Sequence, residues 1–205
     1  MGKAFVPGSR AWLDGSTRTH LADRSMATTF FRPDRSLGIW AIGEFAENAY
    51  YRVMIANGFA TSDLQFSAID NDLTYSGSMW WYPIGDYGKG YADLEWHEEP
   101  AVRVGQSFTF AAHTDLDDQN APQAEQNFVR LSDGTRLITP DALAPGVTVL
   151  ASDIYLYAID AAFKYRGWSL NSELYFRWLT EFDTIGGPSP HAQLYDGGFY
   201  LDAGY

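Results

Sequence analysis

Strict alternation of apolar and polar residues is the most regular feature of the chain, and it is clearest between Val149 and Phe182. Large apolar residues there occupy every second position in two successive runs, which are joined at Arg166-Gly167-Trp168. A period of two is the period of a β-strand, in which neighbouring side chains point to opposite faces. The pattern therefore predicts a β-hairpin with one apolar and one polar face.

The same alternation predicts further strands on both sides of this hairpin. They cover Leu37 to Phe45, Ala49 to Gly58, Leu73 to Pro83, Ala101 to His113 and Asp196 to Tyr205, with a short strand at Gly2 to Pro7. Tyr91 to His97 is assigned to a structured turn, because another strand there would place two short connections in succession. No segment longer than a turn or two has a helical period. The sequence thus predicts an all-β antiparallel fold of about eight strands.

In the hairpin, the aromatic residues gather on one face. Its members are Tyr155, Tyr157, Ile159, Ala161, Phe163 and Tyr165 in the first run, and Trp168, Leu170, Leu174, Phe176, Trp178 and Phe182 in the second. Such runs exceed the five or six residues of a usual soluble strand and the roughly 9 to 11 that cross a bilayer at a tilt. Large aromatics near strand ends are typical of outer-membrane barrels. The pattern favours a transmembrane β-barrel, with a soluble β-sandwich as the alternative.

Connection lengths alternate in the way that such barrels require, with short turns at one end and long loops at the other. The long connections are residues 8–36, 59–72, 114–148 and 183–195. Residues 114–148 are rich in Asp, Gln, Asn and Pro, so we expect a long external loop there. The whole chain, residues 1–205, is expected to form a single domain.

Composition narrows the classes of function. The 205 residues carry a net charge of −12, which argues against a protein that binds duplex nucleic acid. The chain has no cysteine, so disulfide frameworks and thiol nucleophiles are excluded. No stretch has the roughly 18 consecutive apolar residues of a membrane helix.

Several strand segments carry a resemblance to a known family. They are Leu37-Gly38-Ile39-Trp40, Tyr51-Arg52-Val53-Met54-Ile55-Ala56-Asn57-Gly58, Val104-Gly105-Gln106-Ser107-Phe108 and Lys164-Tyr165-Arg166-Gly167-Trp168-Ser169-Leu170. With these segments the chain resembles the phosphate-selective porin O and P family. Arg130-Leu131-Ser132-Asp133-Gly134-Thr135-Arg136-Leu137, followed by Pro145-Gly146-Val147, resembles its planctomycete-type branch.

The resemblance implies a transmembrane β-barrel of the bacterial outer membrane. Family members form trimers of roughly 16-stranded barrels and are about twice as long as this chain, which implies that the chain is a central part of such a barrel. The closing strand resembles an internal strand of the family, although its alternation up to Tyr205 also fits the end of a complete barrel. The implied partners are outer-membrane lipid, small anionic solutes and further copies in a homotrimer. The implied activity is passive diffusion, without catalysis, cofactor or metal.

Basic residues mark the expected anion path. Residues 1–36 have a net charge of +3, and in the family the corresponding loop folds into the lumen, so residues 8–36 are expected to form a basic constriction loop. Arginine binds phosphate through paired hydrogen bonds. The candidates are Arg10, Arg18, Arg24, Arg32 and Arg35 in the loop, and Arg52, Arg103, Lys164 and Arg177 on the strands.

Two observations weaken an assignment to strict phosphate selectivity. Arg24, Arg32 and Arg35 have Asp23 and Asp34 as neighbours, and ion pairs between them would pin the loop instead of binding solute. The polar strand face also carries as many acids as bases: Glu44, Asp160, Glu173, Glu181 and Asp202 against Arg52, Arg103, Lys164, Arg166 and Arg177. The sequence therefore predicts a porin with a weak preference for anions.

Other motifs predict no chemistry. Residues 96–100 are expected to form a salt network in a turn, and residues 85–90 a glycine-rich turn. Residues 115–120 begin like a calcium loop but lack its glycine and its bidentate glutamate. No histidine accompanies a nucleophile motif, so an enzyme is not expected. Two other functions stay open: a carbohydrate-binding β-sandwich using Trp80, Trp81 and Tyr82, and a small eight-stranded barrel without a channel.

Overall fold

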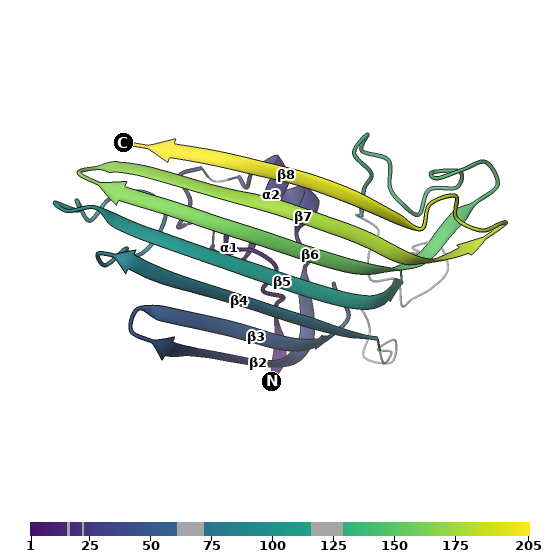
Figure 1. Ribbon diagram of the computed structural model, residues 1–205, viewed down its shortest axis with the longest axis horizontal. Helices are drawn as coiled ribbons and strands as arrows, with labels where there is room; N and C mark the ends of the chain where they lie inside the picture. Colours follow the sequence, from purple (N-terminus) through teal and green to yellow (C-terminus); the bar gives the residue numbers. More distant parts are fainter. Residues whose placement is uncertain (16, 22, 61–71, 116–128) are drawn as a thin grey trace.

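The computed structural model describes residues 1–15, 17–21, 23–60, 72–115 and 129–205, and these form one antiparallel sheet with two short helices (Figure 1). The strands are β1 (Gly2–Phe5), β2 (Arg35–Ala46), β3 (Ala49–Asn57), β4 (Leu73–Ile84), β5 (Ala101–Asp115), β6 (Thr148–Tyr165), β7 (Trp168–Ile185) and β8 (Gln193–Gly204). The helices are α1 (Arg10–Leu13) and α2 (Met26–Phe31). The all-β antiparallel prediction is confirmed, and the predicted strands are all present.

The eight strands form a meander in which each strand pairs with its neighbours in the chain. The β2–β3 and β6–β7 turns lie at the same end of the sheet as the C-terminus, and the β7–β8 connection lies at the other end (Figure 1). The predicted hairpin turns at Arg166 and Gly167, whose φ values of 47° and 84° are those of a type I′ turn. Tyr91 to His97 forms no strand, as predicted.

The two faces of the sheet differ in chemistry. On the outer face, apolar side chains are exposed on every strand from β2 to β8, and cross-strand pairing places them side by side. Its members include Ile39, Val53, Tyr75, Met79, Trp81, Val104, Phe108, Ile159, Phe163, Leu170, Leu174, Tyr195, Phe199 and Leu201. The inner face carries the polar residues of the same strands, among them Arg52, Arg103, Asp160, Lys164, Asn171, Glu173, Arg177, Asp196 and Asp202.

The N-terminal segment lies across the inner face. Helix α1 contacts β5, and α2 contacts β7 and β8. Phe31 of α2 stacks on Tyr175 with ring centroids 5.2 Å apart. At the end with the long connections, Val129 and Leu137 join Ile154 in an apolar cluster. The inner face is therefore covered in part by the chain itself, mainly over β5 to β8, whereas the outer face has no cover among the described residues.

The sheet contradicts the two alternative folds and corrects one residue assignment. Its order runs from β1 to β8 without a β1–β8 pair, so the described sheet is open and is neither a closed barrel nor the two sheets of a sandwich. Phe182 does not lie on the outer face as predicted, but packs against the apolar cluster at the end of the inner face. Register shifts in the β6–β7 pair, together with a φ of 50° at Glu181, reverse the alternation after Thr180. Among the described residues, no helix has the length and apolar character needed to cross a membrane.

Candidate functional site on the inner face

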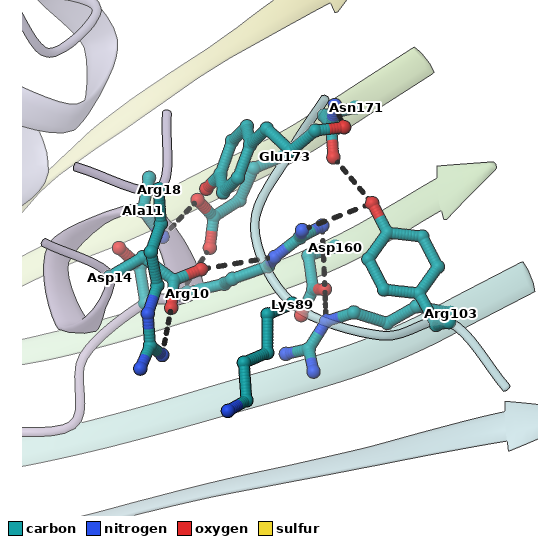
Figure 2. A network of polar contacts seen from close by, with 12 residues as sticks. Arg10, Ala11, Asp14, Arg18, Lys89, Arg103, Asp160, Asn171 and Glu173 are labelled. Carbon is teal, nitrogen blue, oxygen red and sulfur yellow. Dashed lines mark hydrogen bonds and ion pairs between the residues drawn. The ribbon is translucent and has the colours of Figure 1, made fainter. Parts of the chain in front are cut away.

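The centre of the inner face is a buried polar network that joins the N-terminal segment to β7 (Figure 2). Ser9 caps α1 by accepting the N–H of Trp12. The N–H groups of the first two helical residues, Arg10 and Ala11, donate to the carboxylate of Glu173 at 2.8 and 3.2 Å. Tyr175 also donates its hydroxyl to this carboxylate at 2.7 Å. Glu173 therefore satisfies groups that the start of a helix leaves without intrahelical partners.

The Arg10 guanidinium connects this centre to β5 and β6. It lies 4.2 Å from the ring centroid of Tyr91, and Nη2 donates to the hydroxyl of Tyr87 at 3.3 Å. Its Nη1 lies 3.9 Å from Asp160, whose carboxylate accepts a 2.9 Å hydrogen bond from Nε of Arg103. Gly105 on β5 leaves room for Asp160, because a Cβ there would lie 2.2 Å from its Oδ2. One carboxylate thus pairs with two predicted anion-path cations.

Two further predicted cations hold loops against the sheet. Buried Lys164 donates to the carbonyl oxygens of Tyr87 and Lys89, both at 3.1 Å, and so fixes the β4–β5 connection. Arg177 pairs with Asp196 at 2.7 Å and donates to the carbonyl oxygens of Phe30 and Arg130. At these positions both side chains stabilise the packing of loop segments against the sheet.

The remaining predicted cations lie closer to solvent. Arg18 pairs with Asp14 at 3.8 Å, and its side chain is 55 % exposed. Arg24 donates to the carbonyl oxygens of Ala11 and Asp14, and these bonds hold the N-terminal segment together. Arg24 and Arg32 lie over the Trp12 ring, Arg35 lies over Phe5, and Arg52 is half-buried on β3. The structure thus joins Arg10, Arg18 and Arg103 to the carboxylates of Asp14 and Asp160, whereas Arg35 and Arg52 lie outside this network.

A Ser–His–Asp arrangement fixes the N-terminal segment to the last two strands. The His20 ring lies 2.8 Å from Asp202 through Nδ1 and 2.8 Å from Ser169 through Nε2. The order of groups is that of a hydrolase triad, but Ser169 is only 3 % exposed, so no substrate carbonyl reaches its hydroxyl in this structure. Sequence reasoning missed this contact because the three residues are far apart in the chain. The absence of enzymatic activity stays a prediction.

Burial raises the pKa values of two tyrosines in the β4–β5 connection. Desolvation raises the pKa of Tyr87, and Arg10 opposes that shift only in part. Desolvation likewise raises the pKa of Tyr91, which hydrogen-bonds to Tyr200 at 3.2 Å. Both phenols therefore stay protonated at neutral pH and serve Arg10 as neutral hydrogen-bond and ring partners.

The predicted salt network of residues 96–100 is centred on Asp93. Burial alone would raise the pKa of Asp93, but hydrogen bonds from the His97 ring and from the N–H groups of Gly167 and His97 hold it below its usual 3.8. A carboxyl of this kind stabilises the fold above its unfolded pKa, and the contribution is lost as the pH falls through the depressed folded value. The contact links the β4–β5 connection to the β6–β7 turn.

We expect the Gly167 amide proton to shift in NMR spectra as the pH falls below 3.8, because Asp93 then releases it. Asp93→Asn should abolish this titration. Asp133→Asn removes another carboxyl of lowered pKa in a separate loop and should leave the titration unchanged. A Gly167 shift that stays constant to pH 2 in the unmodified protein would contradict the assignment.

In the described ranges, no group of three or more His, Asp or Glu side chains could hold a metal ion. The segment that begins like a calcium loop falls mostly in residues 116–128, outside the described residues. A scan of family models, a search of curated proteins and a search of solved structures each give no match. The function is therefore argued from the site itself.

Proposed function

We propose that this chain is part of an outer-membrane porin through which small anions diffuse. The observation that carries the proposal is the opposition of the two faces: exposed apolar side chains on the outer face and charged, hydrogen-bonded ones on the inner face. Soluble sheets hide their apolar face and expose the polar one. A membrane barrel does the reverse, since lipid covers its outside.

Aromatic spacing on the outer face supports a membrane. Tyr155 and Tyr165, Trp168 and Trp178, and Tyr195 and Tyr205 are each ten residues apart on three successive strands. Their rings meet in two rows, with centroids 4.8 Å apart for Trp168 and Tyr205 and 5.4 Å apart for Trp178 and Tyr195. At about 3.3 Å per residue and a tilt near 45°, the rows lie roughly 23 Å apart along a barrel axis. This matches the apolar band of roughly 25 Å in outer-membrane barrels.

The open sheet favours a barrel larger than the described strands. β1 covers only Arg35 to Gly38 of β2, so the rest of β2 and the outer edge of β8 need partner strands. Unpaired backbone groups in hydrocarbon cost several kcal/mol each, by rough estimate. Further strands supply them in the proposed barrel, in line with the porin family that the sequence resembles. The small closed eight-stranded barrel and the sandwich have no support from this sheet.

The inner face suits a weakly selective passage. Asp160 and Asp196 compensate Arg103 and Arg177, so the covered half of the face adds little net positive charge. Arg18 keeps over half of its side chain exposed and can attract anions. Charged groups that attract without binding tightly permit diffusion. We propose outer-membrane lipid and small anions as partners and a homotrimer as the assembly.

Electrophoresis and conductance test this function. The detergent-extracted protein should migrate faster before boiling than after it, and in planar bilayers it should give channels whose reversal potential in a salt gradient favours anions slightly. Arg18→Gln should move that potential toward zero, because it removes an exposed charge without touching the sheet. Solubility without detergent, or no conductance from folded protein, would overturn the proposal.

A further inference from the structure

An aromatic surface lies on the inner face beside the covered network. Tyr50 on β3 stacks on Trp80 of β4, with centroids 5.6 Å apart, and it contacts Tyr82 at 5.7 Å. All three side chains are half-buried, so part of each ring is open. We call Tyr50, Trp80 and Tyr82 the aromatic wall. Helices α1 and α2 contact β5, β7 and β8, which places the wall beside the cover that they form.

Two arginines flank the aromatic wall. The Arg103 guanidinium of β5 lies 5.3 Å from the ring centroid of Trp80. Arg52 is two residues from Tyr50 on the same face of β3, and it pairs across the strands with Ser78, two residues before Trp80. Strand β4 therefore presents Trp80 between an arginine from each neighbouring strand.

Arg52 differs from Arg103 and Arg177 because no carboxylate pairs with it among the described residues. Its Nε is buried and has no hydrogen-bond partner within the described residues. Arg103 pairs with Asp160, and Arg177 pairs with Asp196. Charged groups withdrawn from water are ordinarily paired. The nearest acid toward the turn, Glu44, is exposed and accepts the N–H of Asn48. Arg52 is thus available to an anion from solution.

From these positions we infer that the aromatic wall and Arg52 form a binding site for planar organic carboxylates. The carboxylate accepts hydrogen bonds from the Arg52 guanidinium, and the flat part of the solute packs against the open ring edges of Trp80 and Tyr50, because Tyr50 and Arg103 contact the faces of Trp80. Inorganic phosphate has no flat apolar part, so it would bind the arginine alone and make no contact with the rings. The inference rests on the proposed function, since it names the class of solute that would bind along the passage.

Calorimetry on the full-length protein in detergent tests the site with benzoate, acetate and inorganic phosphate as probes. Benzoate should bind more tightly than either of the others. Trp80→Leu should weaken benzoate binding about threefold to tenfold and leave acetate unchanged. Arg52→Gln should weaken both carboxylates. The matched controls are Trp81→Leu, whose ring is on the outer face, and Arg166→Gln in the exposed turn, and both should bind benzoate normally.

Equal binding of benzoate and acetate by the unmodified protein would overturn the inference, and this comparison needs no variant to fold. Equal effects of Trp80→Leu and Trp81→Leu would also overturn it. Conductance of the same preparations separates the two proposals. A conducting, anion-favouring channel without benzoate preference refutes the site alone, whereas folded protein that binds benzoate without conducting refutes the porin and supports the site.

Discussion

Leu174→Arg is expected to destabilise the protein in lipid vesicles by about 2–4 kcal/mol, the cost of an arginine on the lipid face near the bilayer centre. Leu174 lies on the outer face between the aromatic rows, opposite Ile159 and Phe199 on the neighbouring strands. Its side chain is 43 % exposed, so in a water-soluble sheet the same change would cost no more than about 0.5 kcal/mol. The loss of stability therefore distinguishes a Leu174 that contacts lipid from one that contacts water.

Ile185→Arg is the matched control for this prediction. Ile185 ends the same strand, beyond the row that contains Trp178, and is 61 % exposed. An arginine there would lie near the interface and should cost at most about 1 kcal/mol. Urea titration of the vesicle-inserted protein measures the free energy of unfolding of both variants. The intensity of the heat-modifiable band reports the fraction of folded protein. Equal stabilities for the two variants would argue that the outer face does not contact hydrocarbon.

The strands could be predicted closely because alternation has a fixed period. Once Trp168 faces outward, every second residue to Trp178 must do so too, and the pairing in the structure confirms it. The prediction failed after Thr180, where the φ of 50° at Glu181 reverses the faces. Nothing in the composition of that segment marks an irregularity. Local patterns also do not reveal whether the first and last strands pair with each other, which they do not in this sheet.

The candidate site was predictable in part. The sequence placed Arg103, Lys164 and Arg177 on one face of the strands and Arg10 in a loop, and in the structure all four side chains are buried at the inner face. Their partners could not be predicted, because a polar alternation shows which face a residue occupies but not which distant segment reaches it. The contact between α1 and Glu173 joins residues 163 apart in the chain. Residues 85–90 and Tyr91 to His97 were assigned to turns, so Tyr87 and Tyr91 were missed as inner-face partners of Arg10.

The contact with Glu173 is also the point at which the N-terminal segment is most open to disruption. Glu173→Ala would leave the N–H groups of Arg10 and Ala11 buried without their acceptor, whereas the Tyr175 hydroxyl keeps its contact with Thr28. Each buried donor that loses its partner costs about 1–3 kcal/mol. We expect amide exchange at Arg10 and Ala11 to accelerate by about a hundredfold or more, because each 1.4 kcal/mol is a factor of about ten. The strand amides should keep their protection.

Glu181→Ala removes an exposed acid from the same strand. It should change neither the amide exchange at Arg10 and Ala11 nor the protection of the strand amides. Glu173→Gln keeps one acceptor oxygen and should give an intermediate exchange rate. If the segment narrows a passage, its release should also raise the single-channel conductance of Glu173→Ala while the heat-modifiable mobility stays the same. Unchanged exchange at Arg10 and Ala11 would mean that other contacts hold the segment, with the Arg24 bonds to Ala11 and Asp14 as the next to test.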